Sequence, residues 1–352
     1  MERNYSIDFF KFFAILGVVF IHTNLFSNEI GFILHTFSRF AVPFFFMSSG
    51  YLFNQTIAKQ NTLMGQLKKY LSRIIKIYFC WVLFYFIYDI LSRQVIGTLK
   101  NDYVSLLKNQ TLINVLYYGD STSGFQLWFL TALIWSILII SIFAFYNKIG
   151  ILLLVSIILN TIALLGESYT MFFELPLRTR DTMCFGLMYT TLGYFLGLKS
   201  DQIKKIKIKP LTLSFLFLFF SFTQMIERYI LITQFAQPKG SYFLSTAFIS
   251  LSLFLFVLKY SQLGKGSIIN KIGSNSLGIF VIHVFFIGII NLSVNFLNLS
   301  YINNSVVWQS VYPLIVFVLS YVSYEWIQKV KSYFKQINFV KMITTARNRN
   351  FN

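Results

Sequence analysis

Ten long apolar runs constrain this chain more than any other feature of its sequence. A helix needs about 20 apolar residues to cross the ~30 Å hydrocarbon core of a bilayer. The runs that qualify are about 7–27, 33–54, 73–93, 125–146, 149–166, 182–198, 210–232, 242–260, 275–297 and 306–328. They predict an all-α fold, a polytopic bundle of transmembrane helices with about ten spans.

The composition supports lipid as the solvent of this chain. Hydrophobic residues make up 56% of it and charged residues 12%, whereas soluble domains carry about 25% charged residues. The first run lacks a separate charged region and a small-residue cleavage site, so we expect a retained helix rather than a signal peptide. Segment 103–117 is too polar to span, and we expect it to form an interfacial helix in an outer loop.

The placement of Lys and Arg predicts the orientation. With the N-terminus inside, 22 of the 30 Lys and Arg residues fall on the inner side and 7 on the outer side, while Arg39 lies within a span. Such alternation is what the positive-inside rule describes, and it predicts that both termini are cytoplasmic. It also accounts for the net charge of +18 without a nucleic-acid partner. We expect a transmembrane domain over 1–330 and a basic cytoplasmic tail over 331–352.

Four of the ionisable side chains within or at the edge of the predicted spans are singled out: Lys11, His22, Arg39 and His283. A charge at the centre of a span costs roughly 2.5–3.5 kcal/mol on insertion scales, so such residues are functional candidates. Lys11 and His22 are eleven residues apart, which returns them to within ~20° of one helix face with a rise of ~16 Å. Arg39 is at a depth close to that of His22. The alternative for Lys11 is pairing with Asp8 and snorkelling to the headgroups.

Other polar residues in the apolar runs support weaker predictions. His35 is at the outer edge of its helix, where water is close. His283 is near mid-depth, where it suits either a cavity or a helix–helix hydrogen bond. Cys80 and Cys184 are expected to be small buried hydrophobes, and the spacing of Cys and His predicts no metal site.

The chemistry of these residues allows two functions. Neutral imidazole is a general base near pH 7 and can take a proton from a hydroxyl that attacks an acyl group. Cations along the route from the cytoplasm, including Lys68, Lys69, Arg73 and Lys76 of the inner loop, suit a donor that carries phosphates. Topology alone also explains that cluster, and a proton-coupled transporter would use buried His and Arg as well.

Three segments resemble the acyltransferase-3 family of integral membrane acyltransferases. They are DFFKFFAILGVVFIH (Asp8 to His22), SRFAVPFFFMSSGYLF (Ser38 to Phe53) and RIIKIY (Arg73 to Tyr78). Lys11 and Lys76 stand where the family usually has Arg. Weaker matches are LWFL (127–130), 179–197 and SLGIFVIH (276–283), and the resemblance extends to about residue 328.

The resemblance implies roles for these residues. Acetyl-CoA would be the acyl donor, with Lys11, Arg73 and Lys76 as its contacts, and no metal would take part. His22 would be catalytic, and we assign Arg39 the role of stabilising charge near the reacting acyl group. The acceptor would be a hydroxyl of a cell-surface polysaccharide or glycolipid precursor on the outer side of a bacterial plasma membrane.

Two outer features are candidates for holding that acceptor. The segment 167–181 gathers charged residues, among them Arg180 and Asp181, which suit sugar hydroxyls or belong to a solvated loop. Trp128 suits stacking on a sugar or anchoring in the aromatic belt. His283 is a candidate member of the same cavity.

We therefore expect a multi-pass membrane O-acyltransferase with acyl-CoA, a glycan or lipid-linked sugar and membrane lipids as partners. The alternatives are a transporter or flippase that uses the buried His and Arg without covalent chemistry, and a membrane sensor or scaffold. A transporter would favour inverted repeats and broken helices, neither of which is clear in the sequence.

Overall fold

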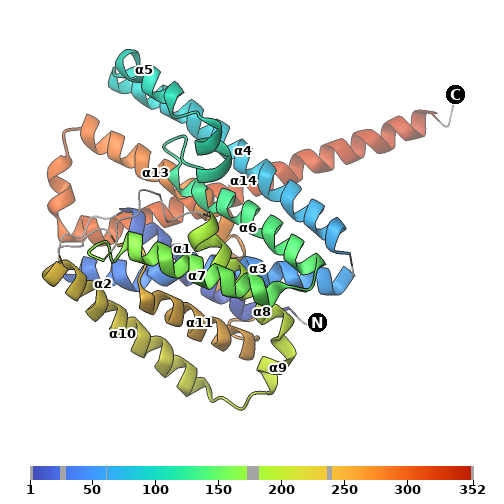
Figure 1. The fold of residues 1–352 in the computed structure, drawn as a ribbon. Coiled ribbons are helices and arrows are strands. Elements are labelled where there is room, and N and C mark those ends of the chain that lie inside the picture. Colours follow the sequence, from blue (N-terminus) through green and yellow to red (C-terminus); the bar gives the residue numbers. More distant parts are fainter. Residues whose placement is uncertain (1–2, 24–28, 61, 173–181, 236–239, 350–352) are drawn as a thin grey trace.

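The computed structural model describes residues 3–23, 29–60, 62–172, 182–235 and 240–349, and the regular structure in these ranges is helical (Figure 1). This confirms the all-α prediction. The longer helices are α1 (Tyr5–Thr23), α2 (Glu29–Phe37), α3 (Ala41–Gln60), α4 (Leu63–Ile96), α5 (Leu99–Lys108), α6 (Trp128–Phe145), α7 (Ile149–Glu167), α8 (Leu187–Leu198), α9 (Ser200–Lys205), α10 (Pro210–Phe235), α11 (Leu244–Lys259), α12 (Ile268–Ser274), α13 (Ser276–Phe296) and α14 (Val306–Arg349). The short helical turns are η1 (Ser38–Phe40), η2 (Asn114–Tyr118), η3 (Phe125–Leu127), η4 (Thr182–Gly186) and η5 (Ser300–Asn304).

The apolar helices coincide with the predicted runs. Eight stretches of the described residues are long and apolar enough to cross a bilayer. The other two runs form shorter apolar helices, Met183–Leu198 and Leu244–Lys259. The chain is thus a multi-pass membrane protein, and ten as the number of spans stays a prediction.

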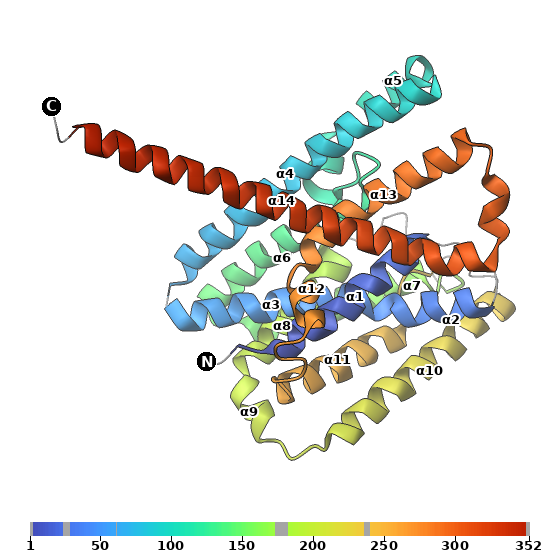
Figure 2. The ribbon, with the colours of Figure 1, turned by 180° about the vertical axis from the view of Figure 1, so that it is seen from behind.

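Two helices continue well beyond their predicted runs. The run 73–93 lies inside the longer α4, and the last run lies inside α14, which continues through the described part of the basic segment. Hydrophobicity marks only the part of a helix that lies in lipid, whereas helical hydrogen bonding continues until a breaker ends it. Figures 1 and 2 show this end of α14 leaving the bundle.

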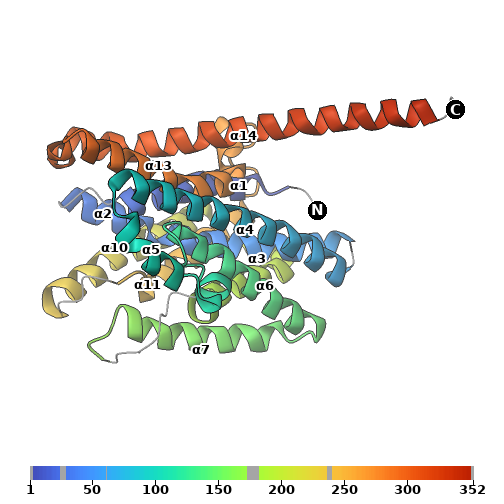
Figure 3. The same ribbon diagram turned by 90° about the horizontal axis from the view of Figure 1, so that it is seen from above.

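Helix α1 lies inside the bundle, where it packs on α3, α12, α13 and α14 (Figure 2). Helices α7 and α14 are on opposite faces (Figure 3). The closest helix contacts use glycine. A Cβ on Gly50 of α3 would lie 2.0 Å from the Thr190 carbonyl oxygen of α8, and one on Gly273 would lie 1.8 Å from the Asp8 carbonyl oxygen of α1. Small residues let helices approach closely in lipid, and the contact at Gly273 brings α12 against α1.

The polar segment 103–117 contains helical structure, as expected. It includes parts of α5 and η2. The Trp135 indole donates a hydrogen bond to the Leu116 carbonyl at 2.8 Å, and the Tyr78 hydroxyl donates to the Val115 carbonyl. These bonds hold the segment against α6 and α4, and its place at a membrane interface stays a prediction.

Candidate active site

Lys11 and His22 lie on the same helix, as the spacing requires. Lys11 is in the first half of α1 and His22 is in its last turn. The Lys11 side chain is 17% exposed, and its ammonium is 4.0 Å from the Asp8 carboxylate. Asp8 also accepts a hydrogen bond from Arg3 at 2.7 Å. Lys11 therefore shares its carboxylate with a second cation.

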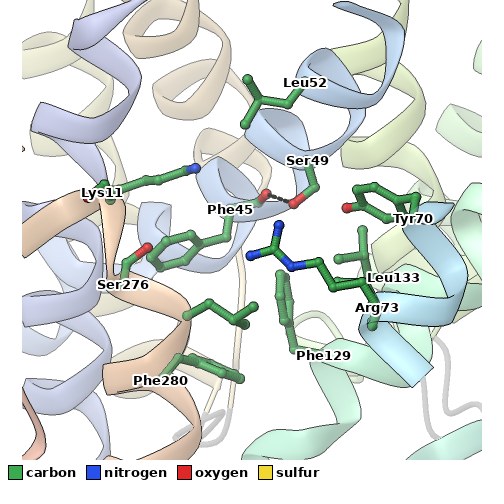
Figure 4. Close-up of a pocket in the computed structure, with 13 residues that line it drawn as sticks. Lys11, Phe45, Ser49, Leu52, Tyr70, Arg73, Phe129, Leu133, Ser276 and Phe280 are labelled. Carbon is green, nitrogen blue, oxygen red and sulfur yellow. Dashed lines mark hydrogen bonds between the residues drawn. The ribbon is translucent and has the colours of Figure 1, made fainter. Parts of the chain in front are cut away.

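Lys11 and Arg73 line one cavity of about 180 Å³ between α1, α3, α4, α6, α12 and α13. Figure 4 shows Lys11 approaching it from one side and the Arg73 guanidinium extending into it from the other. The polar groups of the wall are Ser49, Tyr70, Ser274 and Ser276, and its apolar part is Phe45, Leu52, Ile74, Phe129, Leu133, Leu277 and Phe280. A cavity with two cations and aromatic walls suits an anionic ligand with an apolar part.

Lys76 is not among the residues that line this cavity. It lies one turn after Arg73 on α4, with an exposed side chain. Its place in a donor site stays a prediction. The structure brings Lys11 and Arg73 together and leaves Lys76 outside the cavity wall.

His22 meets two rings at the far end of α1. Its ring centroid is 4.9 Å from that of Phe125, in an edge arrangement, and 5.2 Å from that of His283 on α13. The sequence left open whether His283 is a cavity residue or a helix–helix contact. The structure places it beside His22.

His283 is fully buried. Its Nδ1 is 2.7 Å from the Phe280 carbonyl oxygen, while its Nε2 is buried with no hydrogen-bond partner among the described residues. The ring of Phe280, one turn earlier, is 5.8 Å from that of His283 and also lines the cavity that holds Lys11 and Arg73. Phe280 and His283 therefore connect the cationic cavity to His22 through side chains in contact.

Arg39 lies in η1, which packs on α1. A Cβ on Gly17 of α1 would lie 3.2 Å from the Ser38 side chain, so the glycine lets the turn that holds Arg39 approach α1. Arg39 Nη2 lies 3.4 Å from both ring nitrogens of His35. Arg39 and His35 thus interact, although the sequence predicted only that His35 is at the outer edge of its helix, close to water.

Helix α10 adds polar groups that sequence reasoning missed. Arg228 donates a hydrogen bond to the Thr36 hydroxyl at 2.6 Å and stacks on Phe32, with 4.7 Å from its guanidinium carbon to the ring centroid. The buried amide of Gln224 donates to the Thr36 carbonyl at 2.6 Å. These bonds join α10 to α2 at Thr36, the residue next to His35. Both residues lie inside the run 210–232, so their polarity was the available signal.

A second missed group lies on α4. Asp89 is buried within a predicted span, and its carboxylate accepts a hydrogen bond from the Ser123 backbone at 2.9 Å. The Tyr85 hydroxyl donates to the Val281 carbonyl at 2.8 Å and accepts from Gln126 at 2.8 Å. An acid in an apolar run is the same signal that singled out Lys11. These bonds hold the segment before α6, and Phe125 with it, against α4 and α13.

The acceptor candidates are less closely defined. Trp128 begins α6 and packs on Phe46 and Phe185, with ring centroids 6.0 and 6.1 Å away. Arg180 and Asp181 lie outside the described residues. Their roles therefore stay predictions.

The comparisons with known proteins agree with the motifs. A family model described as an acyltransferase domain of the acyltransferase-3 family matches residues 4–325. Two curated proteins of Enterococcus faecalis, both named amino-acid racemase, are 28% identical, one over 305 residues and the other over 223. These matches cover 80% and 58% of this chain, but only 41% and 30% of the relatives.

The chain thus spans less than half the length of these relatives, and their name does not define what the shared part does. No solved structure matches the chain. The family match covers nearly all of the 352 residues and agrees with the helical, multi-pass fold. The chain belongs to the acyltransferase-3 family and is a multi-pass membrane protein.

Proposed function

We propose that this protein is a membrane-embedded O-acyltransferase that moves an acetyl group from cytoplasmic acetyl-CoA to a hydroxyl of a cell-surface glycan or its lipid-linked precursor. One observation carries the proposal. The cavity that holds Lys11 and Arg73 has Phe280 in its wall, and Phe280 contacts His283, which in turn contacts His22. These contacts support the proposal, because they join the proposed donor contacts to the proposed general base through neighbouring side chains.

The cationic cavity suits the donor end of that path. Coenzyme A carries phosphates, and Lys and Arg are the side chains that pair with phosphate oxygens in proteins. Arg73 offers a planar fork, whereas Lys11 offers a compact point charge. The aromatic wall of Phe45, Phe129 and Phe280 suits the less polar arm that ends in the thioester. Lys76, exposed one turn from Arg73, would contact the donor outside the cavity.

His22 suits the chemical step. One ring nitrogen takes the proton of the acceptor hydroxyl while that oxygen forms a bond to the acyl carbon. The carbon–sulfur bond then breaks, and the coenzyme A thiolate takes up the proton held by His22. The oxyanion that forms between these steps needs a nearby positive charge. Arg39, held close to α1 at Gly17, is the residue we assign to that role.

The acceptor would approach from the outer side of a bacterial plasma membrane. The positive-inside pattern puts the His22 end of α1 at that side. Trp128, Arg180 and Asp181 are the proposed sugar contacts, and His283, whose ring lies beside that of His22, is a further proposed member of the acceptor site. The proposed partners include membrane lipids and no nucleic acid.

Membrane vesicles containing the protein provide the test. They are incubated with acetyl-CoA labelled in the acetyl group, and label is followed into extracted glycans and glycolipids, whose masses identify the acetylated unit. His22→Ala should abolish transfer at an unchanged level of inserted protein. The control is Lys148→Ala, an exposed cation in the turn between α6 and α7, which should transfer normally.

A transporter or flippase makes the opposite prediction. It would move a sugar or small solute across the vesicle membrane in a proton-dependent way, and no acetyl label would enter any product. Normal label transfer by His22→Ala would remove His22 from the mechanism. Solute uptake without transfer by the unaltered protein would establish the transporter instead.

A further inference from the structure

Histidine is rare in this chain, and two of its three copies face each other. The ring centroids of His22 and His283 are 5.2 Å apart, and the rings are tilted by 33°. They come from α1 and α13, far apart in the sequence. The third, His35 on α2, lies against Arg39 of η1. The juxtaposition of His22 and His283 is therefore a product of the fold.

The contacts of His283 define its tautomer. Its Nδ1 is 2.7 Å from the Phe280 carbonyl oxygen, and a carbonyl oxygen only accepts hydrogen bonds. Nδ1 therefore carries the proton. A neutral ring then has its lone pair on Nε2, and that atom is buried without a hydrogen-bond partner among the described residues.

A buried acceptor without a donor is unusual, because leaving such a group unsatisfied costs about 1–3 kcal/mol. The neighbouring His22 ring carries an N–H whenever it is neutral and two when it is protonated. A general base of this type is commonly oriented by a third group that accepts its other N–H. His283 is placed to be that group.

We propose that His283 is the positioning residue of the general base, and that its Nε2 accepts a hydrogen bond from the ring N–H of His22 during acyl transfer. The inference rests on the proposed role of His22. The bond holds His22 in the tautomer whose other nitrogen faces the acceptor hydroxyl. It also remains when His22 has taken up the proton, since His22 is then a stronger donor. No proton passes to His283.

Two substitutions separate this role from simple packing. The side chain of His283→Asn ends near the position of Nδ1, so it can keep the contact with Phe280 but loses the distant acceptor. His283→Gln is longer and brings an amide oxygen close to the position of Nε2. If His283 positions His22, the Gln variant should keep most of the turnover, and the Asn variant should lose about 10- to 100-fold in kcat. The KM for acetyl-CoA should not change in either.

A packing role predicts the opposite order, because the bond to Phe280 is then the one that matters. Equal kcat for both variants and the unaltered protein would also overturn the inference. In a His22→Gln background, His283→Asn should not slow the residual reaction further, because its effect passes through His22. An additional loss in that background would show that His283 acts independently.

A measurement that needs no turnover completes the test. The chain contains three histidines, so ring-¹⁵N-histidine labelling of the protein in lipid gives a spectrum of three imidazoles, assigned by substituting each in turn. We expect His283 protonated at Nδ1, and a His22 signal that moves in His283→Asn but less in His283→Gln. Protonation of His283 at Nε2 would overturn the proposal even if His22→Ala is inactive, whereas an active His22→Ala would overturn the proposed function.

Discussion

The ammonium group of Lys11 and the guanidinium group of Arg73 lie on opposite sides of one cavity, Lys11 on α1 and Arg73 on α4 (Figure 4). Like charges in a confined, partly apolar space repel each other more strongly than in water. Asp8, 4.0 Å from Lys11, already accepts a hydrogen bond from Arg3. An anion between the two cations would relieve that repulsion, and the phosphates of the proposed donor would supply such an anion.

Lys11→Ala should raise the KM for acetyl-CoA by about 10- to 100-fold, because a hydrogen bond to a charged group contributes about 1.5–3 kcal/mol. The kcat should change little, since the bond to the donor is present before and during the reaction. Lys11→Arg keeps the charge and should remain close to the unaltered protein. Transfer rates at varied acetyl-CoA concentration measure both constants.

The matched control for Lys11 is Lys148→Ala, which removes one cation from an exposed turn. It should leave the KM unchanged. An unchanged KM in Lys11→Ala would remove Lys11 from the donor site. A similar rise of the KM in both variants would instead indicate a general effect of surface charge. Such an effect should disappear in 0.5 M salt, because the Debye length is then well below ~8 Å.

Arg73→Ala should weaken donor binding far more than Lys76→Ala, although the two cations are one turn apart in the same motif. Arg73 lines the cavity and Lys76 does not. Both side chains are exposed, but an exposed charge with no cavity around it contributes only about 0–1 kcal/mol to an interaction. Lys76→Ala should therefore raise the KM less than about 5-fold. Competition by unlabelled coenzyme A measures the two effects directly. An equal loss in both variants would place the donor phosphates outside the cavity.

The sequence predicted the helical fold. It also singled out Lys11 and His22 of α1 as functional candidates, because an ionisable residue inside an apolar run is costly to place in lipid. It also predicted that Lys11 and His22 share a helix face, since that follows from helical geometry alone. The contact between His22 and His283 could not be predicted in this way. It depends on how α13 packs on α1, which involves residues more than 250 positions apart.

The position of Lys76 outside the cavity could not be predicted from the sequence either. The motif groups Arg73 with Lys76, but the neighbouring helices decide which of the two faces a cavity. Asp89 and Arg228 were missed for a different reason. Each is a charged residue inside a mostly apolar run, a signal that the sequence did provide, while their partners Ser123 and Thr36 could be found only in the fold.

Gly50→Ala should destabilise the bundle strongly. The added Cβ would lie 2.0 Å from the Thr190 carbonyl oxygen, so α3 and α8 must move apart. Overpacking of this kind costs about 1–3 kcal/mol or more. The matched control is Gly150→Ala in α7, where a Cβ meets nothing within 4 Å. That variant should be as stable as the unaltered protein in a thermal unfolding scan in detergent, and equal stability of both variants would contradict the close α3–α8 contact.

Glu227→Gln should destabilise the junction between α10 and α11. The Glu227 carboxylate accepts hydrogen bonds from the Leu244 and Ser245 backbone N–H groups at 2.8 and 3.1 Å, and from the hydroxyls of Tyr169 and Ser245. These N–H groups begin α11 and have no partner within the helix. The negative charge also interacts favourably with the positive end of the helix dipole.

Gln keeps the shape of Glu227 but replaces one accepting oxygen with a donor and removes the charge. We expect a loss of about 1–3 kcal/mol in the free energy of unfolding, measured by denaturant titration in detergent. Glu29→Gln is the comparison, because Glu29 is exposed in the first turn of α2 and should lose only the dipole interaction of about 0.3–1 kcal/mol. Equal losses in the two variants would mean that the charge near a helix end, and not the set of hydrogen bonds, accounts for the contribution of Glu227.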